Sequence, residues 1–246
     1  MDISVFLGIL GDTEQGFTLP LVIDYFSVIV GVITGALFAC EKKLDIVGTV
    51  ALGLITGYGG GIIRDMLLQD KGVYFTSHPD LVLICIAICF FVFYFRGIFK
   101  QLKATVFLCD SLSVALFAVA GASKAFACGE GLVMTVLLGA ITSVGGGAIR
   151  DICVGEVPGI FKRSNLYAVA GLAGSTIFTV LAALFVPQSI SALACVFSVV
   201  TLRYWSVYSD WKTTDDADLT PRVTASLLRW KQSLHAVFLQ GGNKGK

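Results

Sequence analysis

The chain carries a series of long apolar stretches, and these limit the folds open to it. The hydrocarbon core of a bilayer is about 30 Å thick, so a helix of about 20 apolar residues spans it. Charged residues make up only 14% of the chain, whereas soluble domains carry about 25%. The sequence therefore predicts an all-α membrane protein. Seven stretches are candidate transmembrane helices: residues 22–40, 46–67, 80–96, 105–127, 131–153, 165–186 and 188–208.

Basic residues between these stretches indicate the orientation of the chain. Loops on the cytoplasmic side of a membrane are enriched in Lys and Arg. If the N-terminus lies outside, the outer loops hold chiefly Lys71, and the basic residues of the cytoplasmic loops are Lys42, Lys43, Arg96, Lys100, Lys103, Lys162 and Arg163. We therefore predict an extracytoplasmic N-terminus and a cytoplasmic C-terminus. Because the basic residues are spread over separate loops, they argue against nucleic acid as a partner.

An internal repeat groups the first six stretches into two sets of three. An offset of 86 residues aligns GGGIIRD, residues 59–65, with GGGAIRD, residues 145–151, without a gap. The same offset aligns TVALGLIT from Thr49 with TVLLGAIT from Thr135. Self-similarity at a fixed offset indicates a duplication. Because each copy contains three spans, the second enters the membrane from the opposite side, which predicts inverted repeats.

This organisation divides the chain into five segments. The two inverted three-helix repeats occupy residues 22–103 and 104–187, and a seventh transmembrane helix follows at residues 188–208. Residues 1–21 form an extracytoplasmic segment, and residues 209–246 form a cytoplasmic tail. The end of the tail has the apolar spacing of a short basic amphipathic helix on the membrane surface, although a loosely ordered tail fits the sequence nearly as well.

Three consecutive glycines lie near the middle of spans two and five. Each glycine costs a helix about 1 kcal/mol relative to alanine, so the triplets predict a break or kink whose backbone lines a cavity. The alternative is close packing of two helices. We favour the cavity because both triplets lie at equivalent depth. The six residues are Gly59, Gly60 and Gly61 in the first repeat and Gly145, Gly146 and Gly147 in the second.

Charged side chains follow both triplets. Arg64 and Asp65 lie towards the outer face in the predicted topology, and Arg150 and Asp151 lie towards the inner face. A charge inside a span costs at least about 2.5 kcal/mol at the bilayer centre and normally marks an ion pair or a water path. The sequence leaves both roles open, separately or combined.

Three further charges belong to the candidate site. Asp24 and Asp110 stand at equivalent positions near the starts of spans one and four. A carboxylate there suits the positive end of the helix dipole, so capping is the simpler role. Lys124 has Phe38 at the equivalent position of the first repeat, and it either snorkels to the membrane surface or faces the pore.

The sequence offers no basis for enzymatic chemistry. It contains no Ser/His/Asp arrangement, phosphate-binding loop or dinucleotide fingerprint. Its seven cysteines lack a metal-ligand spacing such as CxxC. We predict that the protein is not an enzyme and has no cofactor.

Three motifs together resemble the bacterial branch of the trimeric intracellular cation (TRIC) channel family, also described as UPF0126-type membrane proteins. They are the doubled GGGxIRD, GASKAFACG at residues 121–129, and GGGAIRDICVGEVPGIF at residues 145–161. The resemblance covers roughly residues 22–208. It implies a homotrimer of seven-helix protomers in the bacterial inner membrane, each with its own hydrated pore between the inverted halves. Permeant K⁺ or Na⁺, membrane lipid and the other protomers are the partners that it implies.

The resemblance also assigns roles to residues. It implies that the glycine triplets kink the second and fifth helices beside the pore, with Arg64, Asp65, Arg150, Asp151 and Lys124 as nearby polar positions. Animal members carry a denser lysine, glutamate and arginine cluster near Lys124 that is linked to phosphoinositide binding. This chain has a lone lysine there, so the resemblance does not extend to that regulation.

Three function classes remain open from the sequence. A weakly selective potassium-permeable channel fits because the sequence contains no carbonyl ladder of the TVGYG kind. Some bacterial relatives have been linked to glycine uptake, so a secondary transporter of a small metabolite such as glycine is the alternative. A non-conducting scaffold would account for the spans but not for the glycines and charges within them.

Overall fold

A computed structural model describes residues 21–69, 72–100, 103–161 and 166–209. All regular secondary structure within these residues is helical. The predicted extracytoplasmic segment and cytoplasmic tail fall almost entirely on residues 1–20 and 210–246, which lie outside the described residues.

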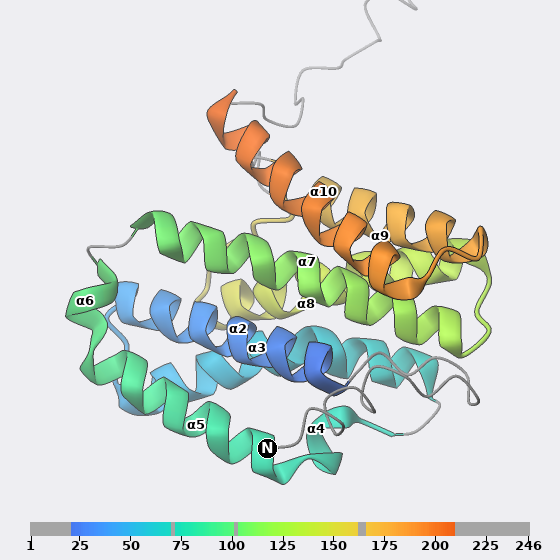
Figure 1. Cartoon of the computed structure of the whole chain (residues 1–246). Helices are drawn as coiled ribbons and strands as arrows, with labels where there is room; N and C mark the ends of the chain where they lie inside the picture. Colours follow the sequence, from blue (N-terminus) through green and yellow to red (C-terminus); the bar gives the residue numbers. More distant parts are fainter. Residues whose placement is uncertain (1–20, 70–71, 101–102, 162–165, 210–246) are drawn as a thin grey trace, which may run out of the picture. The chain divides into compact units, whose positions relative to one another are not determined.

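Each of the seven predicted spans coincides with a helix (Figure 1). The helices are α2 (Leu21–Glu41), α3 (Ile46–Leu68), α5 (Pro79–Tyr94), α7 (Lys103–Ala127), α8 (Leu132–Cys153), α9 (Tyr167–Ala183) and α10 (Gln188–Tyr208). Short helices α4 (Tyr74–Ser77) and α6 (Arg96–Lys100) flank α5. Five helices, α2, α3, α7, α8 and α10, are long and apolar enough to cross a membrane, whereas the apolar helices α5 and α9 have 16 and 17 residues. The prediction of an all-α membrane protein is confirmed at this level.

Local sequence determines where several of these helices begin and end. Helix α3 starts after Asp45, whose side chain accepts a hydrogen bond of 2.7 Å from the backbone N–H of Gly48. This is the usual N-cap interaction, which satisfies an otherwise unpaired donor. Helix α5 begins with Pro79, a residue suited to the first turn. Beyond α8 the chain turns at Gly155, which has a φ of 74°.

The helices pack as two groups that make equivalent contacts. Helices α2, α3 and α5 pack against one another, and so do α7, α8 and α9. The groups meet where α3 packs on α8 and α2 packs on α7. Helix α10 packs on α7 and α9, so in Figure 1 α5 lies on one side of the bundle and α9 and α10 lie on the other.

Each group has its own apolar core. The first core joins α2, α3 and α5, and Phe117 from α7 enters it. The second core joins α7, α9 and α10 around the fully buried ring of Phe178. Helix α8 packs against α7 and α9 of its own group and against α3 of the other.

Helices α3 and α8 run through their glycine triplets without interruption. The prediction of a break in the helix is therefore wrong. A Cβ atom on Gly60 would overlap the carbonyl oxygen of Thr142, and one on Gly146 would overlap the carbonyl oxygen of Thr56. The two backbones touch at these points, which glycine permits and a larger residue prevents. Packing between the helices offsets the low helix propensity of glycine.

The three glycines of each triplet have different surroundings. A Cβ on Gly59 would lie 3.3 Å from the Cα of Gly146, and a Cβ on Gly145 would lie 3.3 Å from the Cα of Gly60. By contrast, a Cβ on Gly61 would come only within 3.9 Å of its nearest neighbour, the Arg64 guanidinium. The first two glycines of each triplet thus serve helix packing, as in the alternative interpretation of the sequence.

We expect Gly146→Ala to lower the free energy of unfolding by about 1–3 kcal/mol, because its methyl group would overlap backbone that cannot move aside. Gly61→Ala is the matched control, and it should leave stability unchanged or slightly raised, since alanine favours the helix. Thermal unfolding of both purified variants in detergent measures the difference. Equal stability of the two would contradict the packing role.

Candidate functional site

Two groups of charged side chains lie at opposite ends of α2. Near the start of this helix, Asp24 lies 3.7 Å from Nη1 of Arg64. Near its end, the ring centroid of Phe38 lies 4.1 Å from the guanidinium carbon of Arg150. The arginines that follow the two glycine triplets are therefore held at opposite ends of the bundle, because α3 and α8 cross at their glycines.

The first charge cluster consists of Asp24, Arg64, Asp65 and Lys124. Oδ1 of Asp65 lies 2.8 Å from Nε of Arg64 and 2.8 Å from Nζ of Lys124. Arg64 also donates a hydrogen bond of 3.4 Å from Nη1 to the carbonyl oxygen of Ala120. Arg64 and Asp65 are both only 3% exposed, so these bonds compensate for charges removed from water. Lys124 reaches from α7 to α3, and its side chain is a quarter exposed.

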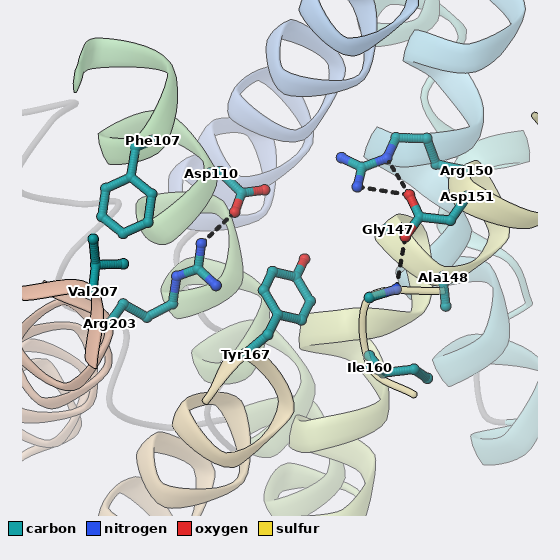
Figure 2. A pocket seen from close by; sticks show the side chains of 11 residues that line it. Phe107, Asp110, Gly147, Ala148, Arg150, Asp151, Ile160, Tyr167, Arg203 and Val207 are labelled. Atoms are coloured by element: carbon teal, nitrogen blue, oxygen red, sulfur yellow. Dashed lines mark hydrogen bonds and ion pairs between the residues drawn. The ribbon is translucent and has the colours of Figure 1, made fainter. Parts of the chain in front are cut away.

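The second charge cluster consists of Asp110, Arg150, Asp151 and Arg203. Nε and Nη2 of Arg150 lie 3.0 Å and 2.8 Å from Oδ1 of Asp151 (Figure 2). Oδ2 of Asp151 accepts a hydrogen bond of 2.9 Å from the backbone N–H of Gly159, which ties the segment after α8 to the cluster. Nη2 of Arg203, from α10, lies 2.5 Å from Oδ2 of Asp110.

The structure corrects the role expected for Asp110. Helix α7 begins at Lys103, two turns before this residue, so its carboxylate cannot cap the helix. It pairs with Arg203 instead. Asp24 does lie in the first turn of α2, and its carboxylate also faces an arginine, Arg64.

A cavity of about 430 Å³ borders the second charge cluster. In Figure 2, the ring of Tyr167 lies between the Asp110 and Arg203 pair and the Arg150 and Asp151 pair. Both ion pairs therefore face the same space. The lining residues are Phe107, Asp110, Gly147, Ala148, Arg150, Asp151, Gly159, Ile160, Tyr167, Arg203 and Val207.

A much smaller cavity, of about 10 Å³, borders the first charge cluster. That volume holds about one water molecule. Aromatic rings of Tyr58, Phe75 and Phe117 are part of its lining, which also includes Asp24, Val28, Gly57, Gly61, Ile62 and Arg64. Gly61 and Gly147, the third glycines of the triplets, thus line equivalent cavities at the two ends.

Sequence reasoning found most of these side chains but missed Arg203, Tyr167 and Phe38. These three residues lie outside the repeated motifs that indicated the other site residues. Arg203 carried a signal of its own, since an arginine within an apolar span marks an ion pair or a water path. Among the residues that the structure describes, no group of three His, Cys, Asp or Glu side chains could hold a metal ion.

Comparison with known proteins identifies the family. A family model described as "Glycine transporter" matches residues 21–97 and 107–183, two matches that start 86 residues apart. The UPF0126 membrane protein of Deinococcus radiodurans is 34% identical over 188 residues, which are 74% of this chain and 87% of that protein. The crystal structure of the TRIC trimeric intracellular cation channel orthologue from Rhodobacter sphaeroides is 34% identical, with a TM-score of 0.72 over 77% of this chain and 97% of that chain. The chain belongs to the TRIC family.

A further relative extends this TRIC family assignment. The UPF0126 inner membrane protein YadS of Escherichia coli is 34% identical over 156 residues, which are 63% of this chain and 75% of that protein. The family predicted from the doubled GGGxIRD motif is thereby confirmed, and the proteins that it resembles are described as membrane proteins and cation channels, not as enzymes.

We expect Asp65→Asn to lower the free energy of unfolding by at least about 3 kcal/mol, because it leaves Arg64 and Lys124 without their shared carboxylate in a buried place. Glu156→Gln is the matched control. It removes one partner of the ion pair between Lys42 and Glu156, and the side chains of these residues are 38% and 35% exposed. The change should lower the free energy of unfolding by less than about 1 kcal/mol. Unfolding of both variants in detergent measures the difference. A similar loss of stability in both would contradict the stabilising role proposed for Asp65.

Proposed function

We propose that the protein is a homotrimeric channel for monovalent cations, with K⁺ as a permeant ion and one hydrated pore in each protomer. The observation that carries this proposal is the pair of cavities at opposite ends of the crossing of α3 and α8, each bordered by buried charges. Charged groups inside an apolar bundle normally mark an ion path. The similar Rhodobacter sphaeroides protein, described as a trimeric cation channel, supports both the activity and the assembly.

The proposed pore passes the third glycine of each triplet. Gly61 and Gly147 line the two cavities, while the other glycines hold α3 against α8. The cavity at the second charge cluster forms a hydrated vestibule. The path narrows at the first charge cluster, where aromatic rings leave room for about one water molecule.

The pore should select weakly among monovalent cations. Strongly selective filters replace the water around an ion with rings of backbone carbonyls. In α3 and α8 the backbone is helical throughout the glycine triplets, so its carbonyls are engaged within the helices. Cations would therefore pass with much of their water, and pore width and side-chain charge would set the preference.

For the topology, we propose seven transmembrane helices in two inverted repeats, with the N-terminus outside and the C-terminus in the cytoplasm of a bacterial inner membrane. Placement of Arg64 and Arg150 at opposite ends of α2 supports the inversion. Helices α5 and α9 occupy equivalent places in the repeats and are similarly short, 16 and 17 residues. A short span is accommodated by local thinning of the bilayer.

Glycine transport remains the second candidate function, and the description of the matching family model is what favours it. A carrier would use the same two cavities in turn, with only one open at a time. The channel and the carrier differ in whether ions cross as a continuous current.

The purified protein in planar bilayers should give unitary potassium currents, and in liposomes it should not accumulate radiolabelled glycine against a gradient. Currents are expected because a continuous hydrated path needs no conformational cycle for each ion. Native mass spectrometry of the same preparation should report a trimer. Glycine accumulation without unitary current would replace the channel with the carrier, and an active monomer would remove the assembly from the proposal.

A further inference from the structure

Arg203 is a buried cation that lies outside the two repeats in the sequence. It lies in α10 and is 6% exposed. Its Nη2 lies 2.5 Å from Oδ2 of Asp110, and its Nε donates a hydrogen bond of 3.1 Å to the Ser111 hydroxyl. The guanidinium carbon lies 5.1 Å and 4.7 Å from the ring centroids of Phe107 and Tyr167, within the range of cation–π interaction. These contacts hold the charge in one place.

The two charge clusters have the same charge composition, but the residues that supply it come from different helices. Each contains two carboxylates, an arginine that follows the glycine triplet, and one additional cation. In the first cluster the additional cation is Lys124, and the equivalent residue beside the second cluster is Phe38. In the second cluster it is Arg203, which α10 contributes from outside the two repeats.

We propose that Arg203 sets the charge selectivity of the vestibule by cancelling the charge of Asp110. This inference rests on the proposed channel function and adds to it a residue that governs cation preference. Asp110 and Arg203 both line the cavity of about 430 Å³. With Arg203 in place, the second charge cluster carries no net charge, so this cluster adds little to the preference of the proposed channel for cations over anions.

Loss of the Arg203 charge leaves the Asp110 carboxylate uncompensated beside the water of the vestibule. A net negative vestibule attracts cations and repels anions, as rings of acidic residues do at the mouths of cation channels. Loss of the Asp110 charge has the opposite effect, since Arg203 then repels cations. A residue that only fills space between α7 and α10 would show no such opposition of sign.

The test is the K⁺/Cl⁻ permeability ratio, obtained from reversal potentials in a KCl gradient across a planar bilayer. Arg203→Gln keeps hydrogen-bonding groups without charge and should raise the ratio roughly threefold to tenfold, the size expected for one unit charge acting across a hydrated space. Asp110→Asn should lower it by a similar factor. The double variant should return to within about twofold of the original ratio, since both charges are gone.

Arg203→Lys is the control for structure, because it retains the charge while losing the forked geometry. It should keep the ratio near that of the original protein. If Arg203→Gln does not assemble, Asp110→Asn still tests the proposal through its lowered ratio. If the original protein conducts but either Asp110→Asn or Arg203→Gln leaves the ratio unchanged, the proposed role of Arg203 is overturned and the channel function stands. The same holds if both variants move the ratio in one direction. Absence of potassium current in the original protein overturns the channel function and this inference together.

Discussion

Where α3 crosses α8, each backbone fits against a carbonyl oxygen of the other, because Gly60 and Gly146 have no side chain. The rest of the site depends on this approach. The next glycine of each triplet, Gly61 or Gly147, faces a cavity instead of the crossing. The Arg and Asp pairs follow one turn after the crossing in each helix. Arg64 lies beside the start of α2, and Arg150 lies beside its end. A crossing with larger residues would separate the helices and lose this geometry.

Buried charges are stable in this bundle because several groups share each of them. Asp65 holds two cations from two helices, and Asp151 holds Arg150 and a backbone N–H of the segment after α8. Such pairs seldom add net stability over an apolar core, but removing one partner is costly. The clusters therefore hold α2 and α7 to the crossing while keeping polar groups beside the proposed path.

The sequence predicted the helices well and their interactions less well. Apolar length alone placed every predicted span on a helix, because the thickness of a bilayer sets the length of a spanning helix. The break at the glycines was predicted from helix propensity, which packing between α3 and α8 overrides. The capping role expected for Asp110 is wrong because its helix begins at Lys103, two turns before it. Arg203 was missed because its partner is distant in sequence, and pairing of that kind leaves no local pattern.

The central claim is that the two repeats are oppositely directed, so that the charge clusters face opposite sides of the membrane. Lys42 and Cys128 test it most directly, since they are equivalent exposed residues at the ends of α2 and α7. Two chains are needed, one with Cys128 as its sole cysteine and one with only Lys42→Cys. A membrane-impermeant thiol reagent added outside intact cells should label the first and not the second, and inverted vesicles should reverse the result. Labelling of both from the same side would contradict the account.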